Sequence, residues 1–191
     1  MNIRLLVSIF LTVSASLRAG PPTEFLDIPW GSPIAEAKRI LTQRPGASLK
    51  AETELKLTYI GGTFATYPVD RYELEMFEGH LVKGKVFLVM PSGTAKNGGL
   101  LSDHQFEDLC KSLTSKYGKV PRITDGQHAE SNWSWTTTNP RTRQKRTTEV
   151  RLSYWFFRRE FSISYSNLPT APVAAESQDA KLKEETKKKD L

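Results

Sequence analysis

Residues 150–166, VRLSYWFFRREFSISYS, decide the fold of this chain of 191 residues. Apolar side chains take alternate positions on either side of a charged centre; they are Val150, Leu152, Tyr154 and Phe156, then Phe161, Ile163 and Tyr165. A period of two gives each run one apolar face, as in a half-buried β-strand. Because Arg158-Arg159-Glu160 separates the two runs, the stretch predicts a β-hairpin with one face packed against the rest of the protein.

The same alternation recurs upstream and predicts further antiparallel strands. Strand patterns cover residues 54–60, 63–67, 71–78, 81–90 and 132–138. In the run 81–90, the residues expected to share one face are Val82, Val86, Leu88 and Met90. Glu78-Gly79-His80 separates 71–78 from 81–90 and predicts a second hairpin, since glycine adopts the left-handed conformations that tight turns need.

Two helices are expected, each ahead of one group of strands. Ser32-Pro33 provides an N-cap and a first helical residue, and Pro45-Gly46 ends that helix. Ser102 and Gln105 form the pattern of a capping box, and Gly118 ends the second helix. An apolar stripe runs along the second helix; it comprises Phe106, Leu109, Cys110, Leu113 and Tyr117.

The order of helix and then strands occurs twice along the chain. The sequence therefore predicts an α+β fold of two helix-plus-antiparallel-β-meander repeats, about residues 25–92 and 100–167, with both helices on one face of the sheet. The second copy needs an insertion, which we place in the polar run 136–148. Residues 20–169 are long enough for one domain of this kind.

The stretch FLDIPWGSPIAEAKRIL, residues 25–41, contains the motif F-x-x-I-x-W-G-S ahead of a helix. It resembles the start of a group of small exported bacterial proteins, and the layout of residues 25–166 is similar to the beta-lactamase inhibitor protein family and to outer-membrane lipoproteins of the SmpA/OmlA type. The resemblance implies a non-catalytic binding or assembly role and transfers no functional residue. This chain differs in having neither a lipid-anchor cysteine nor cysteine pairs.

Both ends of the chain have compositions unlike the middle. Residues 1–19 join Arg4 to a short apolar run and small residues, which predicts a signal peptide cleaved after Ala19, or after Ala15. We therefore expect an exported protein, periplasmic or secreted, that is not integral to the membrane. Residues 170–191 are rich in charge and lack aromatic residues, which favours a disordered tail. The single cysteine, Cys110, excludes an intramolecular disulfide.

The positive charge of the chain is concentrated in residues 141–159. The formal net charge is +6, and this segment alone holds seven basic residues against one acidic residue. The candidate binding residues there are Arg141, Arg143, Arg146, Arg158 and Arg159. Such a local field attracts anionic glycans, lipid headgroups or an acidic partner, whereas export argues against nucleic acid. A solvated loop is the alternative interpretation.

Trp133 and Trp135 lie at alternate positions of the strand 132–138 and share one face. If that face is covered by the helices, both are core residues. If it is the open face, they form an aromatic platform for a partner protein, a sugar or a peptide strand. The sequence leaves these two interpretations open.

Catalytic and ligand-binding motifs are scarce. His80, His104 and His128 have no spacing typical of a metal site, and we expect no metal and no cofactor. Glu73 and Glu75 lie opposite Lys83 and Lys85, so cross-strand ion pairs account for these charges without an active site.

Three functional hypotheses follow. The first is an exported, non-enzymatic binding protein of the bacterial envelope whose partner is another envelope or secreted protein. The second is an electrostatic binder of an anionic polymer or membrane surface through residues 141–159. The third is an exported hydrolase that has no recognisable motif.

Overall fold

The structure, a computed structural model, describes residues 20–93, 101–125 and 127–169. Its first half contains β1 (Glu24–Phe25), β2 (Ile28–Pro29), α1 (Ile34–Thr42), β3 (Ala47–Glu52), β4 (Lys56–Gly61), β5 (Thr63–Phe64), β6 (Tyr67–Phe77) and β7 (His80–Leu88). Its second half contains α2 (Leu101–Tyr117), β8 (Arg122–Thr124), β9 (His128–Thr138), β10 (Lys145–Trp155) and β11 (Glu160–Pro169). The expected signal peptide and tail lie outside the described residues.

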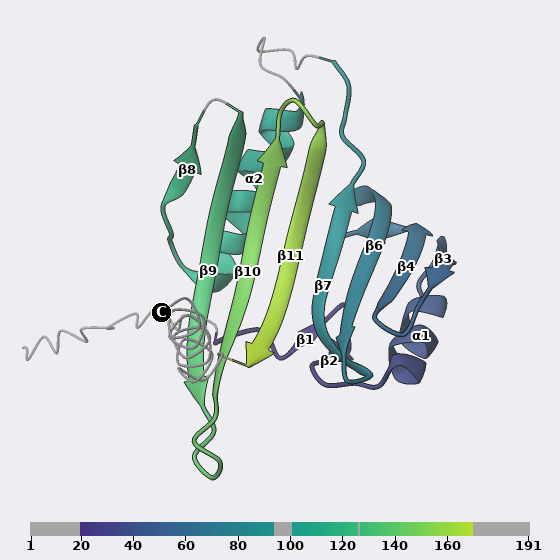
Figure 1. Ribbon diagram of the computed structural model, residues 1–191. Coiled ribbons are helices and arrows are strands. Elements are labelled where there is room, and N and C mark those ends of the chain that lie inside the picture. The colour runs from purple at the N-terminus through teal and green to yellow at the C-terminus, as the bar shows by residue number, and fades with distance from the viewer. Residues whose placement is uncertain (1–19, 94–100, 126, 170–191) are drawn as a thin grey trace, which may run out of the picture.

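One antiparallel sheet forms the body of the molecule (Figure 1). Its strand order is β3-β4-β6-β7-β11-β10-β9-β8, with the short β5 paired to β6 and with β1 and β2 forming a separate pair. Each helix precedes its own group of strands, and the last strands of the two groups, β7 and β11, pair at the centre. The predicted α+β class with an antiparallel sheet is therefore confirmed.

Both helices cover the same face of the sheet, as predicted. On α1, Ala37 and Leu41 are buried in one core with Tyr59 of β4. On α2, the ring of Phe106 meets the ring of Phe161 edge-on, with centroids 6.0 Å apart. The pairing register places the core-facing side chains of neighbouring strands opposite one another. For example, Tyr72 of β6 lies opposite Val86 of β7. Burial of these continuous apolar rows supplies the main favourable contribution to folding.

The starts of the helices differ from the prediction. Pro33, not Ser32, is the N-cap of α1, and it makes no side-chain capping hydrogen bond. Ser102 lies inside α2, where its Oγ accepts a hydrogen bond of 2.9 Å from the Tyr154 hydroxyl. The capping-box interpretation was wrong because Ser102 is buried against β10, so its hydroxyl satisfies a core tyrosine.

A β-bulge changes one face assignment on β7. Glu75 pairs with Lys83 and Met76 pairs with Leu81, which leaves Val82 without a cross-strand partner. Leu81, not Val82, is thereby buried on the core face. A single extra residue in one strand reverses the side to which the preceding residues point.

Two strands of the main sheet were not predicted at all, and both form its edges. The side chains of β3 are exposed along most of its length, and those of β8 along all of it, so neither strand shows an apolar alternation. Both strands are held by pairing to an inner neighbour, β3 to β4 and β8 to β9. Pairing of this kind depends on tertiary context rather than on local pattern.

The N-terminal segment packs across the helix-covered face. Phe25 is fully buried, and its ring lies directly on Gly84 of β7, where any side chain would overlap it. The same ring is 5.7 Å from the ring of Tyr165 on β11. Trp30 fastens the segment through a hydrogen bond of 2.8 Å from its Nε1 to the carbonyl oxygen of Pro22. Phe25 therefore bridges the two central strands.

Within the described residues no helix covers the other face of the sheet, and most of its side chains are polar. The predicted pair of Glu75 with Lys83 is present at 2.7 Å. Glu73 pairs instead with Lys56 at 2.9 Å and with Arg71 at 3.0 Å, and Lys85 reaches Glu160 on β11 at 3.2 Å. The network of ion pairs on this face extends over more strands than predicted. The reason is that β4 and β11 lie on either side of the β6–β7 hairpin and contribute Lys56 and Glu160.

Candidate functional site

Trp133 and Trp135 lie on the helix-covered face. The Trp133 side chain is only 1% exposed, and its Nε1 donates a hydrogen bond of 2.7 Å to the carbonyl oxygen of Gly118. Trp135 is half-buried and meets the ring of Tyr117 at 5.3 Å. The two side chains belong to the core, so the open-face platform is ruled out by the placement of α2 over β9.

The five candidate arginines of 141–159 form two groups rather than one. Arg141 and Arg143 lie in the β9–β10 turn, with Arg146 just inside β10, whereas Arg158 and Arg159 lie in the β10–β11 turn. The two turns are at opposite ends of β10 (Figure 1). A strand of 11 residues is roughly 35 Å long, so no small anion contacts both groups. The candidate arginines therefore do not form one compact patch, and binding of an anionic polymer or membrane surface through residues 141–159 stays a prediction.

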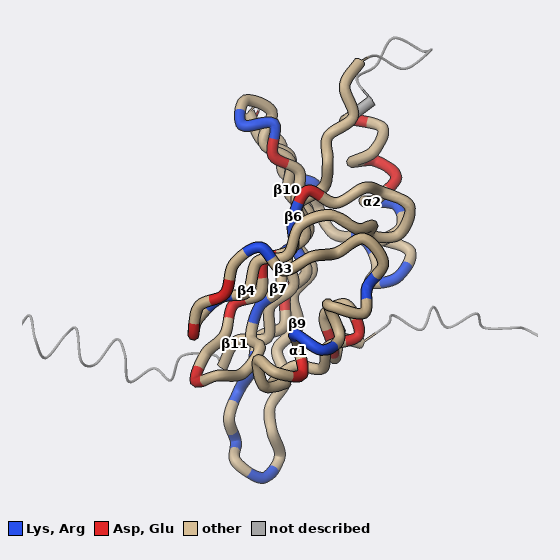
Figure 2. Tube along the Cα trace, turned by 90° about the vertical axis from the view of Figure 1, so that its right-hand side faces the viewer, with Lys and Arg blue, Asp and Glu red and all other residues tan. Residues whose placement is uncertain are grey.

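The β9–β10 hairpin forms a long basic arm, which carries Lys and Arg near its tip (Figure 2). Asn139 orders the tip, since its Oδ1 accepts hydrogen bonds from the backbone N–H groups of Arg141 at 2.9 Å and Thr142 at 3.2 Å. This is the Asx-turn chemistry that asparagine provides. The arginine side chains at the tip are exposed, and none is fixed against an aromatic ring in the described part of the chain.

The β10–β11 turn, in contrast, combines arginines with exposed aromatic residues. We call Trp155, Phe157, Arg158 and Arg159 the turn surface. Phe157 is 80% exposed and Trp155 is 37% exposed. The Trp155 ring stacks on His128 with centroids 4.1 Å apart, and the Arg158 guanidinium lies 5.5 Å from the Trp155 ring centroid. The stack holds the tryptophan at the surface of the open face.

A hollow of about 300 Å³ adjoins the turn surface. Arg158 and Arg159 line it together with Val89 and Met90, which follow the end of β7. Arg71 and Phe87 also line it, and the Arg71 guanidinium lies 3.4 Å from the ring centroid of Phe87. Aromatic and arginine side chains beside a hollow are the composition of binding hot spots in protein interfaces.

The strand alternation contains a signal for this surface that the sequence interpretation did not use. Tyr154 and Phe156 point inward, so Trp155 and Phe157 between and after them must point outward. Outward aromatic residues on a polar sheet face are unusual and indicate a contact surface. The alternation does not identify Arg71 or His128 as part of this surface. Strand pairing brings Arg71 to the hollow and His128 to Trp155.

His128, Glu130 and Ser153 come together on the open face without forming a catalytic triad. Glu130 is the centre of the group: its Oε2 accepts from the Ser153 hydroxyl at 3.4 Å and lies 3.4 Å from His128 Nε2. A triad needs the histidine between the hydroxyl and the carboxylate, and here the carboxylate lies between. Within residues 20–93, 101–125 and 127–169, no cluster of His, Cys, Asp and Glu could hold a metal ion.

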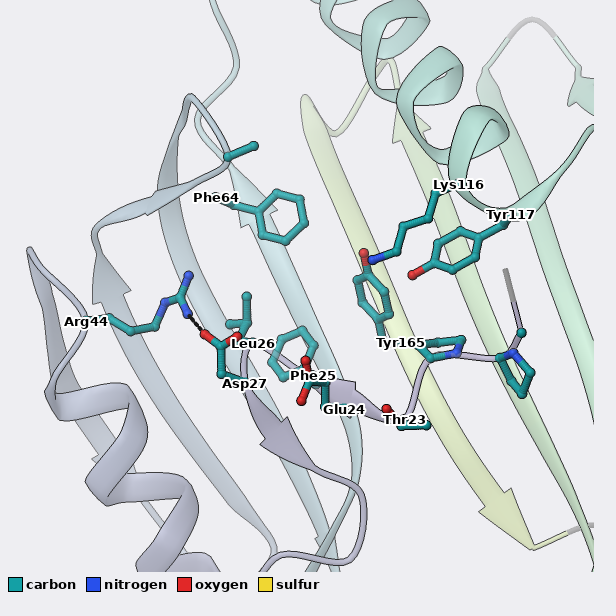
Figure 3. A pocket seen from close by; sticks show the side chains of 14 residues that line it. Thr23, Glu24, Phe25, Leu26, Asp27, Arg44, Phe64, Lys116, Tyr117 and Tyr165 are labelled. Atoms are coloured by element: carbon teal, nitrogen blue, oxygen red, sulfur yellow. Dashed lines mark hydrogen bonds and ion pairs between the residues drawn. The ribbon is translucent and has the colours of Figure 1, made fainter. Parts of the chain in front are cut away.

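A second hollow, of about 410 Å³, lies on the opposite face between α1 and the end of α2 (Figure 3). The N-terminal segment, the β5 region and β11 complete its walls. Figure 3 marks one ion pair among the side chains that line it, between Arg44 and Asp27 at 3.1 Å. Burial raises the pKa of the Tyr165 phenol, and the neighbouring Tyr117 adds to this rise. We call this space the helix-side hollow.

Comparisons with protein-family models, curated proteins and solved structures return no match for this chain. In the part of the chain that is described, neither helix has the length and apolarity needed to span a bilayer.

Proposed function

We propose that this chain is an exported, non-enzymatic binding protein of the bacterial envelope, and that its partner is another envelope or secreted protein held at the turn surface. The observation that carries the proposal is the exposure of Phe157 and Trp155 beside two arginines on one turn. Among the described residues, neither Arg158 nor Arg159 has an ion-pair partner within its own chain. Unpaired arginines next to exposed aromatic rings suit a partner with an acidic and apolar segment.

The proposal includes the internal repeat that the sequence suggested. Each half consists of one helix followed by strands in the same outer-to-inner order, and β7 corresponds to β11. The β6–β7 turn, with Glu78 at a φ of 51°, corresponds to the β10–β11 turn, with Arg159 at a φ of 48°. Under this proposal the second copy has acquired the longer β9–β10 arm and the arginines of the turn surface.

Variants of the turn surface test this function. The variant Phe157→Ser with Arg158→Gln removes one exposed ring and one guanidinium, and it should fold normally because Phe157 is outside the core. Used as bait in an envelope extract, this variant should retain much less of the partner protein than the unchanged chain. The expected loss of affinity is more than about tenfold, since hot-spot residues dominate affinity.

The matched control changes the basic arm instead. The variant Arg141→Gln removes one positive charge, as Arg158→Gln does, but near the other end of β10, and it should retain the same protein as the unchanged chain. Retention at both low and moderate salt is expected, since apolar contacts are not screened. Full retention by the turn-surface variant would contradict the proposal. Loss with the arm variant, together with loss at moderate salt, would favour the anionic-polymer hypothesis.

A further inference from the structure

We infer that the helix-side hollow binds a small zwitterionic ligand with an aromatic or apolar body, of the class of a free amino acid or a dipeptide. The site is on the helix-covered face, whereas the turn surface is on the open face at the other end of β11. The inference therefore stands independently of the proposed partner protein. Three features of the hollow carry it: its size, its charges and its aromatic lining.

The size and construction of the hollow fit a small molecule. Its volume of about 410 Å³ lies at the small end of the range for ligand sites. Its walls come from segments far apart in sequence, including Phe64, Lys116 and Tyr165. Two of these segments belong to the packed core, through Phe25 and Tyr117, so the hollow is largely preformed. A preformed site avoids the ordering cost of assembling a pocket on binding.

The charges of the hollow call for a ligand with both signs. Arg44 and Asp27 neutralise each other on one side. Lys116 on the α2 side and Glu24 on the β1 side have no ion-pair partner within the described part of the chain (Figure 3). Lys116 and Glu24 thus leave one positive and one negative charge at the same hollow. A ligand that carries both a carboxylate and an ammonium group complements this pair better than a ligand that carries only one of them.

Two tyrosines strengthen the end of the hollow that would hold the carboxylate. In Figure 3, Tyr117 and the side chain of Tyr165 lie beside Lys116. A tyrosine hydroxyl is protonated at neutral pH, and burial raises the pKa of Tyr165 further, so this hydroxyl can donate to an anion. Hydrogen bonds between a neutral donor and a carboxylate are stronger than those between neutral groups.

Apart from Thr23, the remaining side chains that line the hollow are apolar or aromatic. Phe64 lies across the hollow from Tyr165, and Phe25 lies in its lower part (Figure 3). The Phe25 ring is itself buried and supports the Tyr165 ring at 5.7 Å, so the aromatic wall of the hollow consists of Tyr165 and Phe64. An apolar ligand body against this wall gains hydrophobic contact in addition to the two charge contacts.

Titration with three related probes tests the inference on the full chain, after mass spectrometry has defined its N-terminus. L-Phenylalanine carries both charges, phenethylamine carries the ammonium alone, and 3-phenylpropionate carries the carboxylate alone. Binding is measured from amide NMR shifts of residues that line the hollow. We expect phenylalanine to bind about threefold to tenfold more tightly than either analogue. A phenylalanine-containing dipeptide distinguishes a free amino acid from a peptide as the favoured zwitterion.

Two exposed charges can be removed with little effect on folding. Lys116→Gln should weaken phenylalanine and 3-phenylpropionate but leave phenethylamine unchanged, and Glu24→Gln should do the reverse. Lys111→Gln, also on α2 but outside the hollow, serves as the control and should change nothing. Equal affinity for all three probes, no binding of either zwitterion, or affinities unaffected by both Lys116→Gln and Glu24→Gln would overturn the inference.

Discussion

Replacing Trp133 with alanine is expected to lower the free energy of unfolding by about 3–5 kcal/mol. The indole is only 1% exposed, and its removal leaves a cavity between α2 and β9 as well as an unpaired carbonyl at Gly118. A loss of this size is a large part of the total stability of a typical domain, about 5–15 kcal/mol. Urea unfolding measured by circular dichroism gives the value directly.

Trp155 provides a matched control for this prediction. It is the same residue type on the neighbouring strand, but it lies on the open face and is 37% exposed. Trp155→Ala should cost about 1 kcal/mol or less, mainly from the lost stack with His128. If Trp133→Ala does not fold, Trp133→Phe keeps most of the volume and permits the comparison. Equal costs for the two tryptophans would contradict the placement of Trp133 in the core.

Gly84→Ala should have the second-largest effect, a loss of about 1–3 kcal/mol in the free energy of unfolding. The new Cβ would overlap the ring of Phe25, which is packed against the β7 backbone at this point. Phe25 would have to leave its position between the two central strands, and the N-terminal segment would move with it. Thermal unfolding of the single variant measures the loss.

A double-mutant cycle with Phe25→Ala identifies the cause of that loss. Phe25→Ala removes the ring that the new methyl group would meet, so Gly84→Ala should cost little in that background. Lys83→Ala, one position earlier on β7, should be nearly neutral because its side chain is on the open face. If Gly84→Ala costs the same with and without Phe25, overlap with the ring is not its cause.

The sequence predicted the inner strands and both helices because these elements have strong periodic patterns. Residues 150–166 form the hairpin that their alternation indicates, and the stripe of α2 faces the sheet. The errors arise where tertiary contacts override a local signal. The Val82 bulge reversed one face assignment, and burial of Ser102 against Tyr154 replaced its capping role.

The candidate site was less predictable than the fold, for a geometric reason. The positive charge of residues 141–159 is concentrated along the sequence but not in space. The strand β10 lies between Arg141 and Arg159 and places them at opposite ends of the sheet. The helix-side hollow joins Glu24, Phe64 and Lys116, whose separations along the chain give no pattern. Only Trp155 at the end of β10 and Phe157 in the turn after it left a signal in the alternation itself.

The most direct test of the proposed function is site-specific photo-crosslinking at residue 157 in living cells. The account predicts that a photoreactive amino acid in place of Phe157 forms a covalent adduct with one envelope or secreted protein. Phe77, which is 56% exposed beside the β6–β7 turn, provides the matched position at the opposite end of the sheet and should give no such adduct. The absence of an adduct at 157, or the same adduct at both positions, would contradict binding at the turn surface.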